Sequence, residues 1–177
     1  MERDRAGDDE PDAFVVVIDP QIGVELTNRI AFRERLSCIA VQGSSPTDCA
    51  RIIQEHCPCQ PDFVLIDGLH SNQQIMLDFN ATFAISGREA TYFFHDIVNF
   101  NLFEGLSQIS ETGRCCAMTT HLLLCTPSGM AVVVRNDAPQ AVRDAIELFS
   151  VSAGEIIAIG KASEAAIADT WLEHVQT

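Results

Sequence analysis

Three apolar, strand-like runs in this chain each end in an aspartate. Phe-Val-Val-Val-Ile leads to Asp19, Phe-Val-Leu-Ile leads to Asp67, and Thr-Tyr-Phe-Phe-His leads to Asp96. Because ligands of α/β proteins bind beyond the carboxyl ends of parallel strands, we expect these carboxylates at a binding site. His70 and His95 follow two of these strands closely and can titrate near neutral pH. Each residue alone could cap a helix or solvate a loop, but the set favours a site.

The chemistry that fits these side chains is cation binding combined with proton transfer. Asp67 and Asp96 offer hard oxygen ligands to a divalent cation, which would orient and acidify a substrate hydroxyl. His70 or His95 would then act as the general base. For His95, a buried imidazole that is hydrogen-bonded to a loop remains an equal alternative.

The elements that position these residues alternate between apolar runs and helical segments. Strands are expected at residues 14–19, 36–41, 62–67, 91–96 and 155–160, and helices at 23–35, from about 47 to 56, and at 72–86, 100–112, 138–149 and 163–175. Ser45 or Thr47 is the expected cap of the second helix. Because the strands are continuously apolar, the pattern predicts an α/β fold with a doubly wound, mostly parallel sheet.

A turn signal, Thr126-Pro127-Ser128-Gly129, separates the apolar runs 115–125 and 130–134. Such a turn between two strands predicts a C-terminal antiparallel hairpin. Residues 1–13 are acidic and poor in apolar side chains, so we expect a disordered tail there. Residues 14–136 would then form the α/β core, and residues 137–177 a helix-strand-helix extension of the same domain.

Composition excludes several classes of partner. The 177 residues include 25 acidic and 11 basic side chains, and the formal net charge is −14. Such a surface repels phosphate backbones and anionic lipid, so no nucleic acid and no membrane are expected as partners. No apolar run is as long as a membrane span, and MERDRAGDDE at the start is unlike a signal peptide, so we expect a cytoplasmic protein.

The seven cysteines do not suggest a disulfide framework, because nothing in the sequence points to export. Those in apolar runs are expected to behave as small buried hydrophobic residues. One cluster, His56-Cys57-Pro58-Cys59, could contribute to a zinc site, but no second cysteine pair follows at the usual spacing. A loop at the end of a helix is therefore favoured over a zinc site.

Two motifs together resemble a known family. Asp67-Gly68-Leu69-His70, followed twenty-odd residues later by Phe94-His95-Asp96, is similar to the fourth- and fifth-strand pattern of class I S-adenosylmethionine-dependent methyltransferases. The match is to the branch related to macrocin O-methyltransferases and cephalosporin-hydroxylase-like proteins, over roughly residues 14–136. The resemblance implies a Rossmann-like methyltransferase fold, S-adenosylmethionine as cofactor, Mg²⁺ at the carboxylates, and a small-molecule hydroxyl or amine as methyl acceptor.

The same resemblance implies which residues would contact the cofactor. Asp19 looks like the second-strand acid that holds the ribose hydroxyls in the family. Gly43-Ser44-Ser45-Pro46 is similar to the loop beside the adenine. Asp67 is expected at the cofactor as well as at the metal.

The matched pattern begins at the family's second strand, so the family's first strand and glycine-rich loop have no counterpart before Asp19. An empty central position in the sheet would leave backbone groups unpaired. In a circularly permuted arrangement, residues 155–160 would fill that position. The favoured alternative places them in an extra edge strand outside the sheet, which leaves the fold incomplete.

Two classes of function therefore remain open. The first is a methyltransferase that acts on a small-molecule hydroxyl or amine. The second is a catalytically inactive, truncated relative that serves as a binding or partner subunit. Because an open strand edge favours pairing with another chain, a homo-oligomer through that edge is expected in the second case.

Overall fold

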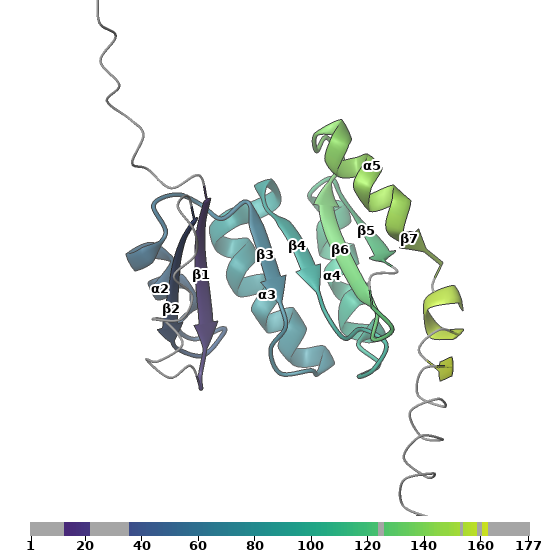
Figure 1. The fold of residues 1–177 in the computed structure, drawn as a ribbon, viewed down its shortest axis with the longest axis horizontal. Coiled ribbons are helices and arrows are strands. Elements are labelled where there is room, and N and C mark those ends of the chain that lie inside the picture. The colour runs from purple at the N-terminus through teal and green to yellow at the C-terminus, as the bar shows by residue number, and fades with distance from the viewer. Residues whose placement is uncertain (1–12, 22–35, 124–125, 153, 159–160, 163–177) are drawn as a thin grey trace, which may run out of the picture. The chain divides into compact units, whose positions relative to one another are not determined.

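The computed structural model describes residues 13–21, 36–123, 126–152, 154–158 and 161–162. The chain divides into two compact units, Met1–Gln60 and Pro61–Thr177 (Figure 1), and each unit contains a sheet of its own. Apart from residue 13, the predicted tail lies outside the described residues. The helices predicted at 23–35 and at 163–175 also lie outside the described residues.

The first unit is built on two parallel strands. β1 (Ala13–Asp19) pairs with β2 (Leu36–Gln42), and Asp19 lies opposite Gln42 in the register. Four consecutive β-branched residues, Val15 to Ile18, favour the extended backbone of β1. Helix α2 (Cys49–His56) follows β2 and buries Cys49, Ile52 and Ile53.

The sheet of the second unit has the strand order β3-β4-β6-β5-β7. Its strands are β3 (Phe63–Ile66), β4 (Thr91–Phe94), β5 (Met118–Leu123), β6 (Met130–Arg135) and β7 (Ser150–Val151). β3 and β4 are parallel, whereas the other pairings in this sheet are antiparallel. The predicted hairpin is confirmed as β5 and β6, and the chain is confirmed as α/β with a mixed pattern of pairing.

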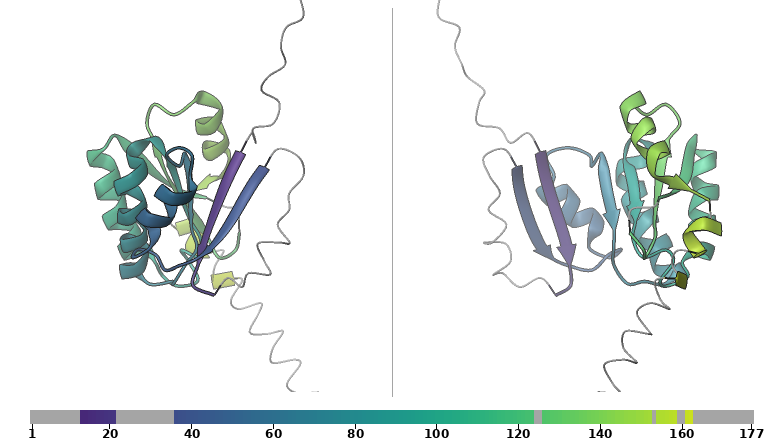
Figure 2. Two further views of the ribbon diagram at one scale, coloured as in Figure 1. Left: turned by 90° about the vertical axis from the view of Figure 1, so that its left-hand side faces the viewer. Right: turned by 45° about the vertical axis from the view of Figure 1, so that its right-hand side comes forward.

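Helices cover both faces of this second sheet (Figures 1 and 2). α3 (Asn72–Ser86) and α4 (Phe103–Cys115) pack on one face, where Phe79, Tyr92 and Ile109 are buried. α5 (Gln140–Phe149) packs on the other face through Ile146. Successive residues of β6 point to opposite faces of the sheet, so Val133 packs in the core under α3 and α4 and Val132 in the core under α5.

Local signals explain where α3 begins and ends. Ser71 precedes the helix, and its side chain accepts a hydrogen bond from the backbone N–H of Gln74 at 3.1 Å. Gly87 ends the helix with φ of +57°, a conformation that favours glycine, and begins the short 3₁₀ helix η1 (Gly87–Glu89). The helix predicted at residues 72–86 is thus confirmed to the residue.

The strand predicted at residues 155–160 is wrong for its described part, because residues 154–158 are helical. A reciprocal capping box explains the difference. The backbone N–H of Glu155 donates to the Ser152 hydroxyl at 3.2 Å, and the Ser152 N–H donates to the Glu155 carboxylate at 2.8 Å. This N-terminal helix signal leaves residues 155–158 unsuited to the central strand of a permuted sheet.

Smaller corrections concern helix boundaries. α4 runs from residue 103 to 115 rather than from 100 to 112, so Cys115 is helical and not part of a strand. α2 begins after Asp48 instead of after Ser45 or Thr47. Among the helices that the structure describes, none combines the length and the apolar composition needed to cross a membrane.

Candidate functional site

The second unit brings the ends of β3 and β4 together. The two strands are parallel neighbours, with Ile66 opposite Phe94, so the residues that follow them emerge at the same edge of the sheet. The backbone N–H of His95 donates to the carbonyl of Ile66 at 3.2 Å, which continues the pairing past the strand end. Asp67 is thereby placed beside His95 and Asp96.

Four polar side chains meet at this edge, and we call Asp67, His70, His95 and Asp96 the site cluster. The Nδ1 atom of His95 lies 3.2 Å from an Asp67 carboxylate oxygen and 3.5 Å from one of Asp96. The Nε2 atom of His70 lies 3.3 Å from an oxygen of each aspartate. The structure thus brings together both predicted metal ligands and both predicted bases.

The site cluster is open to solvent on one side. The Asp67 side chain is 48% exposed and that of Asp96 only 15%, while the two imidazoles are exposed by 24% and 29%. A ligand can therefore reach Asp67 directly. Asp96 forms the inner wall of the cluster, where electrostatic interactions are screened less by water.

Asp96 turns the chain sharply after β4. Its φ is +59°, a conformation that aspartate adopts more readily than most residues. The side-chain amide of Asn99 donates to the Asp96 carboxylate at 3.3 Å, and the N–H of Phe100 donates to the Asp96 carbonyl, also at 3.3 Å. The first bond holds the Asp96 carboxylate, and the second closes the turn that follows β4.

The hairpin turn supports the loop after β4 from a distant part of the sequence. The N–H of Val98 donates to the Ser128 carbonyl at 2.9 Å, and the N–H of Ile97 donates to the Gly129 carbonyl at 3.2 Å. Gly129 has φ of +77°, and an added Cβ would lie 2.5 Å from Val98 Cγ2. Only glycine therefore allows this close approach of turn and loop.

The same turn contacts the site cluster through Ser128. Its hydroxyl lies 3.3 Å from Nε2 of His95 and 2.8 Å from the hydroxyl of Thr126. Sequence reasoning used this turn only as a hairpin signal and missed Ser128 as a site residue. Its one visible signal was a pair of hydroxyl residues next to the glycine, which is common in turns.

Hydrogen bonds of Asn72 connect the N-termini of α3 and α4, which follow the loops of the site cluster. Asn72, the first residue of α3, accepts a hydrogen bond from the Gly105 N–H at 2.8 Å. Its amide nitrogen donates to the carbonyl of Asn101 at 3.3 Å. Because α3 follows His70 and α4 follows the Asp96 loop, these two hydrogen bonds help to set the distance between the two loops.

His70 is also oriented by an aromatic neighbour. Its ring stacks on Phe100 with centroids 4.3 Å apart and an angle of 12° between the planes. This stacking fixes the plane of the His70 ring, whose Nε2 atom faces both aspartates. Phe100 itself is 51% exposed.

The predicted cofactor residues other than Asp67 belong to the first unit. Asp19 is the last residue of β1, and its carboxylate accepts a hydrogen bond from the Gln21 N–H at 2.6 Å. The Ser44 N–H donates to the Asp48 carboxylate at 2.9 Å, and this bond, with Arg51, lowers the pKa of Asp48. An added Cβ on Gly43 would meet Ile52 Cδ1 at 2.5 Å.

The first unit thus gives its loop residues a structural explanation. Gly43 allows α2 to approach β2 closely, and Ser44 takes part in the turn that begins α2. Ser45 precedes Pro46 in the same turn. The proposed contacts of Asp19, Gly43, Ser44 and Ser45 with a cofactor stay predictions.

Asp67, His95 and Asp96 form a group that could hold a metal ion. Each offers one ligand atom, and these atoms all lie within 4.8 Å of one another. Within the described parts of the chain, His56, Cys57 and Cys59 do not form such a group. Cys57 ends α2 in an extended conformation, and burial, followed by the nearby Cys59, raises the pKa of its thiol.

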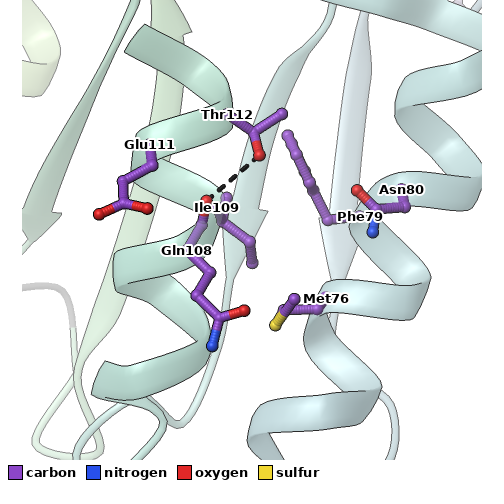
Figure 3. A pocket seen from close by; sticks show the side chains of 7 residues that line it. All are labelled: Met76, Phe79, Asn80, Gln108, Ile109, Glu111 and Thr112. Carbon is purple, nitrogen blue, oxygen red and sulfur yellow. Dashed lines mark hydrogen bonds between the residues drawn. The ribbon is translucent and has the colours of Figure 1, made fainter. Parts of the chain in front are cut away.

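A shallow hollow lies elsewhere in the second unit, between α3 and α4 (Figure 3). Met76 and Asn80 line it from α3, and Gln108 and Thr112 line it from α4. The Thr112 hydroxyl donates to the Gln108 carbonyl of its own helix at 3.2 Å. No residue of the site cluster lines this hollow, so we assign no chemistry to it.

Comparisons of the chain with protein-family models, with curated proteins and with solved structures gave no significant match.

Proposed function

We propose that this chain is a methyltransferase-like protein in which Asp67 and Asp96 hold a divalent cation. The reaction would transfer a methyl group from S-adenosylmethionine to a small-molecule hydroxyl or amine. The observation that carries the proposal is the convergence of two carboxylates and two imidazoles at the ends of β3 and β4. The strand order of the second unit, with an antiparallel hairpin beside two parallel strands, supports a Rossmann-like methyltransferase arrangement.

The donor set fits a divalent cation. Two carboxylates supply hard oxygen ligands, and the exposed side of Asp67 leaves room for a substrate oxygen or water. When bound, the cation would lower the pKa of a coordinated hydroxyl and orient it. Asp96, which is the more buried carboxylate, would hold its inner side.

His70 is the candidate general base. Its Nε2 atom reaches both aspartates, and stacking on Phe100 fixes the ring at the open side of the cluster. An imidazole at this place can accept the proton of an incoming hydroxyl. Positioning of acceptor and methyl donor supplies the remaining catalysis.

Asp19 is the residue we assign to the methyl donor. A carboxylate at the end of a parallel strand can accept hydrogen bonds from both hydroxyls of a ribose. The resemblance to methyltransferases is the support for this role, together with the position of Asp19 at the carboxyl end of β1. Gly43, Ser44 and Ser45 would stand near the adenine in the same proposal.

The test is a methyl-transfer assay with deuterium-labelled S-adenosylmethionine and a panel of small hydroxylated and amine acceptors. Product mass is measured with and without Mg²⁺ or Mn²⁺. Asp96→Asn should abolish turnover, because it removes the inner carboxylate. Asp62→Asn is the matched control, since Asp62 precedes β3 at the opposite end of the strand. Equal turnover by the two variants would contradict the assigned role of the cluster.

A second candidate function, a partner subunit, is supported by the edge of the second sheet. β3 stands at the end of the strand order, and Phe63 and Leu65 on one of its faces are 56% and 53% exposed. An apolar edge strand favours pairing with another chain, including a second copy. Leu65→Lys should then reduce the mass measured by light scattering, whereas Leu148→Lys on the exposed face of α5 should not.

A further inference from the structure

We infer that His95 is a third ligand of the cation, that Ser128 positions it, and that the site therefore selects first-row transition-metal ions such as Mn²⁺ and Zn²⁺ over Mg²⁺. The inference rests on the proposed function only in requiring a cation at Asp67 and Asp96. It reassigns His95 from general base to ligand and leaves His70 as the base.

The spacing of the donor atoms fits a shared ion. Two donors that each lie about 2.1 Å from one ion are about 3.0 Å apart at octahedral angles and about 3.4 Å apart at tetrahedral angles. The Nδ1 atom of His95 lies 3.2 Å from Asp67 Oδ1 and 3.5 Å from Asp96 Oδ1. The first distance lies within this range and the second lies about 0.1 Å above it, so the ring nitrogen of His95 is close to the separation that ligands of one ion adopt.

The nature of the third donor determines the preferred ion. Mg²⁺ binds oxygen ligands and retains water, whereas imidazole suits Zn²⁺ and other first-row transition metals. A site made of two carboxylates alone would allow Mg²⁺ to compete with Mn²⁺ and Zn²⁺ for binding. Adding the nitrogen of His95 strengthens the binding of Mn²⁺ and Zn²⁺ more than that of Mg²⁺.

The other ring nitrogen of His95 has the partner that a metal-bound histidine needs. Ser128 Oγ lies 3.3 Å from Nε2 and can accept its proton while donating to the Thr126 hydroxyl at 2.8 Å. Placing the proton on Nε2 leaves the lone pair of Nδ1 directed at the carboxylates. The Ser128 carbonyl also binds the Val98 N–H at 2.9 Å, which fixes the turn against the His95 loop.

His70 also reaches both aspartates, since its Nε2 atom lies 3.3 Å from Oδ1 of Asp67 and 3.3 Å from Oδ2 of Asp96. It approaches the Asp96 oxygen that does not face His95, and the described group whose ligand atoms all lie within 4.8 Å of one another consists of Asp67, His95 and Asp96. The His70 ring stacks on Phe100, and within the described residues no hydroxyl group bonds to its Nδ1 atom. The two histidines thus have different surroundings, which favours one as ligand and the other as base.

Calorimetric titration of Mn²⁺ and Mg²⁺ into the full chain tests the selectivity. We expect Mn²⁺ to bind at least about tenfold more tightly than Mg²⁺. His95→Asp, which replaces nitrogen by oxygen, should reduce this ratio about tenfold while Mg²⁺ still binds. His121→Gln is the control, because His121 lies on β5 beside Ser150 and outside the cluster. Circular dichroism spectra establish that each variant is folded.

The outcomes separate the inference from the proposed function. A Mn²⁺ to Mg²⁺ ratio that His95→Asp leaves unchanged would overturn the inference, although a cation at Asp67 and Asp96 would still stand. Absence of heat with either ion would overturn both.

A second measurement observes the ligand atom and needs no variant of His95. Imidazole ¹⁵N spectra are recorded during Zn²⁺ titration in a Cys57→Ser/Cys59→Ser background, which removes the two closely spaced thiols beside His56. We expect the Nδ1 resonance of His95 to shift on binding, with the proton on Nε2. Ser128→Ala should weaken Zn²⁺ binding by about tenfold, and Ser107→Ala on the exposed face of α4 should not. A His95 that keeps its proton on Nδ1 in the presence of bound Zn²⁺ would refute the assignment.

Discussion

Substitution by alanine should change the free energy of unfolding in opposite directions at two glycines of α4, Gly105 and Gly113. An added Cβ on Gly105 would lie 2.6 Å from the backbone carbonyl oxygen of Asn72 and 2.9 Å from the Ile75 side chain. An added Cβ on Gly113 would lie 3.3 Å from a methyl group of Val133. Both glycines are buried in the same helix, so their comparison isolates the close approach of α3 and α4.

The magnitudes follow from two opposing effects. Alanine stabilises a helix interior by about 0.8–1 kcal/mol relative to glycine, and this is the upper limit of the gain here, because Gly105 lies in the first turn of α4 and Gly113 in the last. Overpacking costs about 1–3 kcal/mol, and the upper part of this range applies where a backbone oxygen must move. We therefore expect Gly105→Ala to lower the free energy of unfolding by about 1–2 kcal/mol. Gly113→Ala should raise it by about 0.5 kcal/mol, since a methyl group can shift by a few tenths of an ångström.

The substitution at Gly105 should also affect the site cluster. The Gly105 N–H bonds to Asn72, and this contact sets the spacing between the loops that carry Asp67 and Asp96. Separating the two helices should weaken Mn²⁺ binding about tenfold, an effect on the scale seen when the support of a metal ligand is lost. Gly113→Ala should leave the affinity unchanged.

Thermal unfolding followed by circular dichroism measures the first effect. Each kcal/mol corresponds to a shift in Tm of about 4 °C for a unit of this size, so the two variants should differ by about 8 °C. Calorimetry with Mn²⁺ measures the second effect. Equal melting temperatures, or a Gly105→Ala variant that melts above the unchanged protein, would refute the reasoning about helix packing.

Three further predictions concern single side chains. Asp67→Asn should weaken Mn²⁺ binding at least about tenfold in calorimetry, because it removes one charged ligand. Ser71→Ala should lower the unfolding free energy by about 1 kcal/mol in urea titrations, since it removes the cap of α3. The pKa of Asp48 is lowered by the Ser44 amide and then by Arg51. Its stabilisation is therefore present above the ordinary carboxyl pKa of about 3.9 and is lost as pH falls through the lower folded value. Asp48→Asn should thus destabilise the protein at pH 6, and the difference in Tm from the unchanged protein should shrink as the pH is lowered below about 3.9 in melts by circular dichroism.

Several elements could be predicted because their signals are local. The capping serine and the terminal glycine of α3 lie beside the helix in the sequence, and the apolar run of β1 ends at Asp19. The gathering of Asp67, His95 and Asp96 was also predictable. Parallel strands that end in acids place those acids at one edge once the strands are neighbours.

Other features depend on contacts between distant segments. Ser128 reaches His95 across 33 residues of sequence, and no local pattern indicates that the hairpin turn supports the site. The run Ile-Ile-Ala-Ile after Glu155 is apolar at every position, so periodicity alone cannot distinguish a strand from a buried helix. The Ser152–Glu155 capping box decides the question, and its spacing was visible in the sequence.

The central claim is tested most directly by calorimetric titration of S-adenosylmethionine into the full chain in the presence of Mn²⁺. The account predicts binding in the micromolar range that Asp19→Ala weakens, because that carboxylate would hold the ribose hydroxyls. Ala50→Ser on the exposed face of α2 should bind like the unchanged protein. No heat at high cofactor concentration, in a preparation that binds Mn²⁺, would contradict the methyltransferase assignment and leave a cation-binding partner subunit.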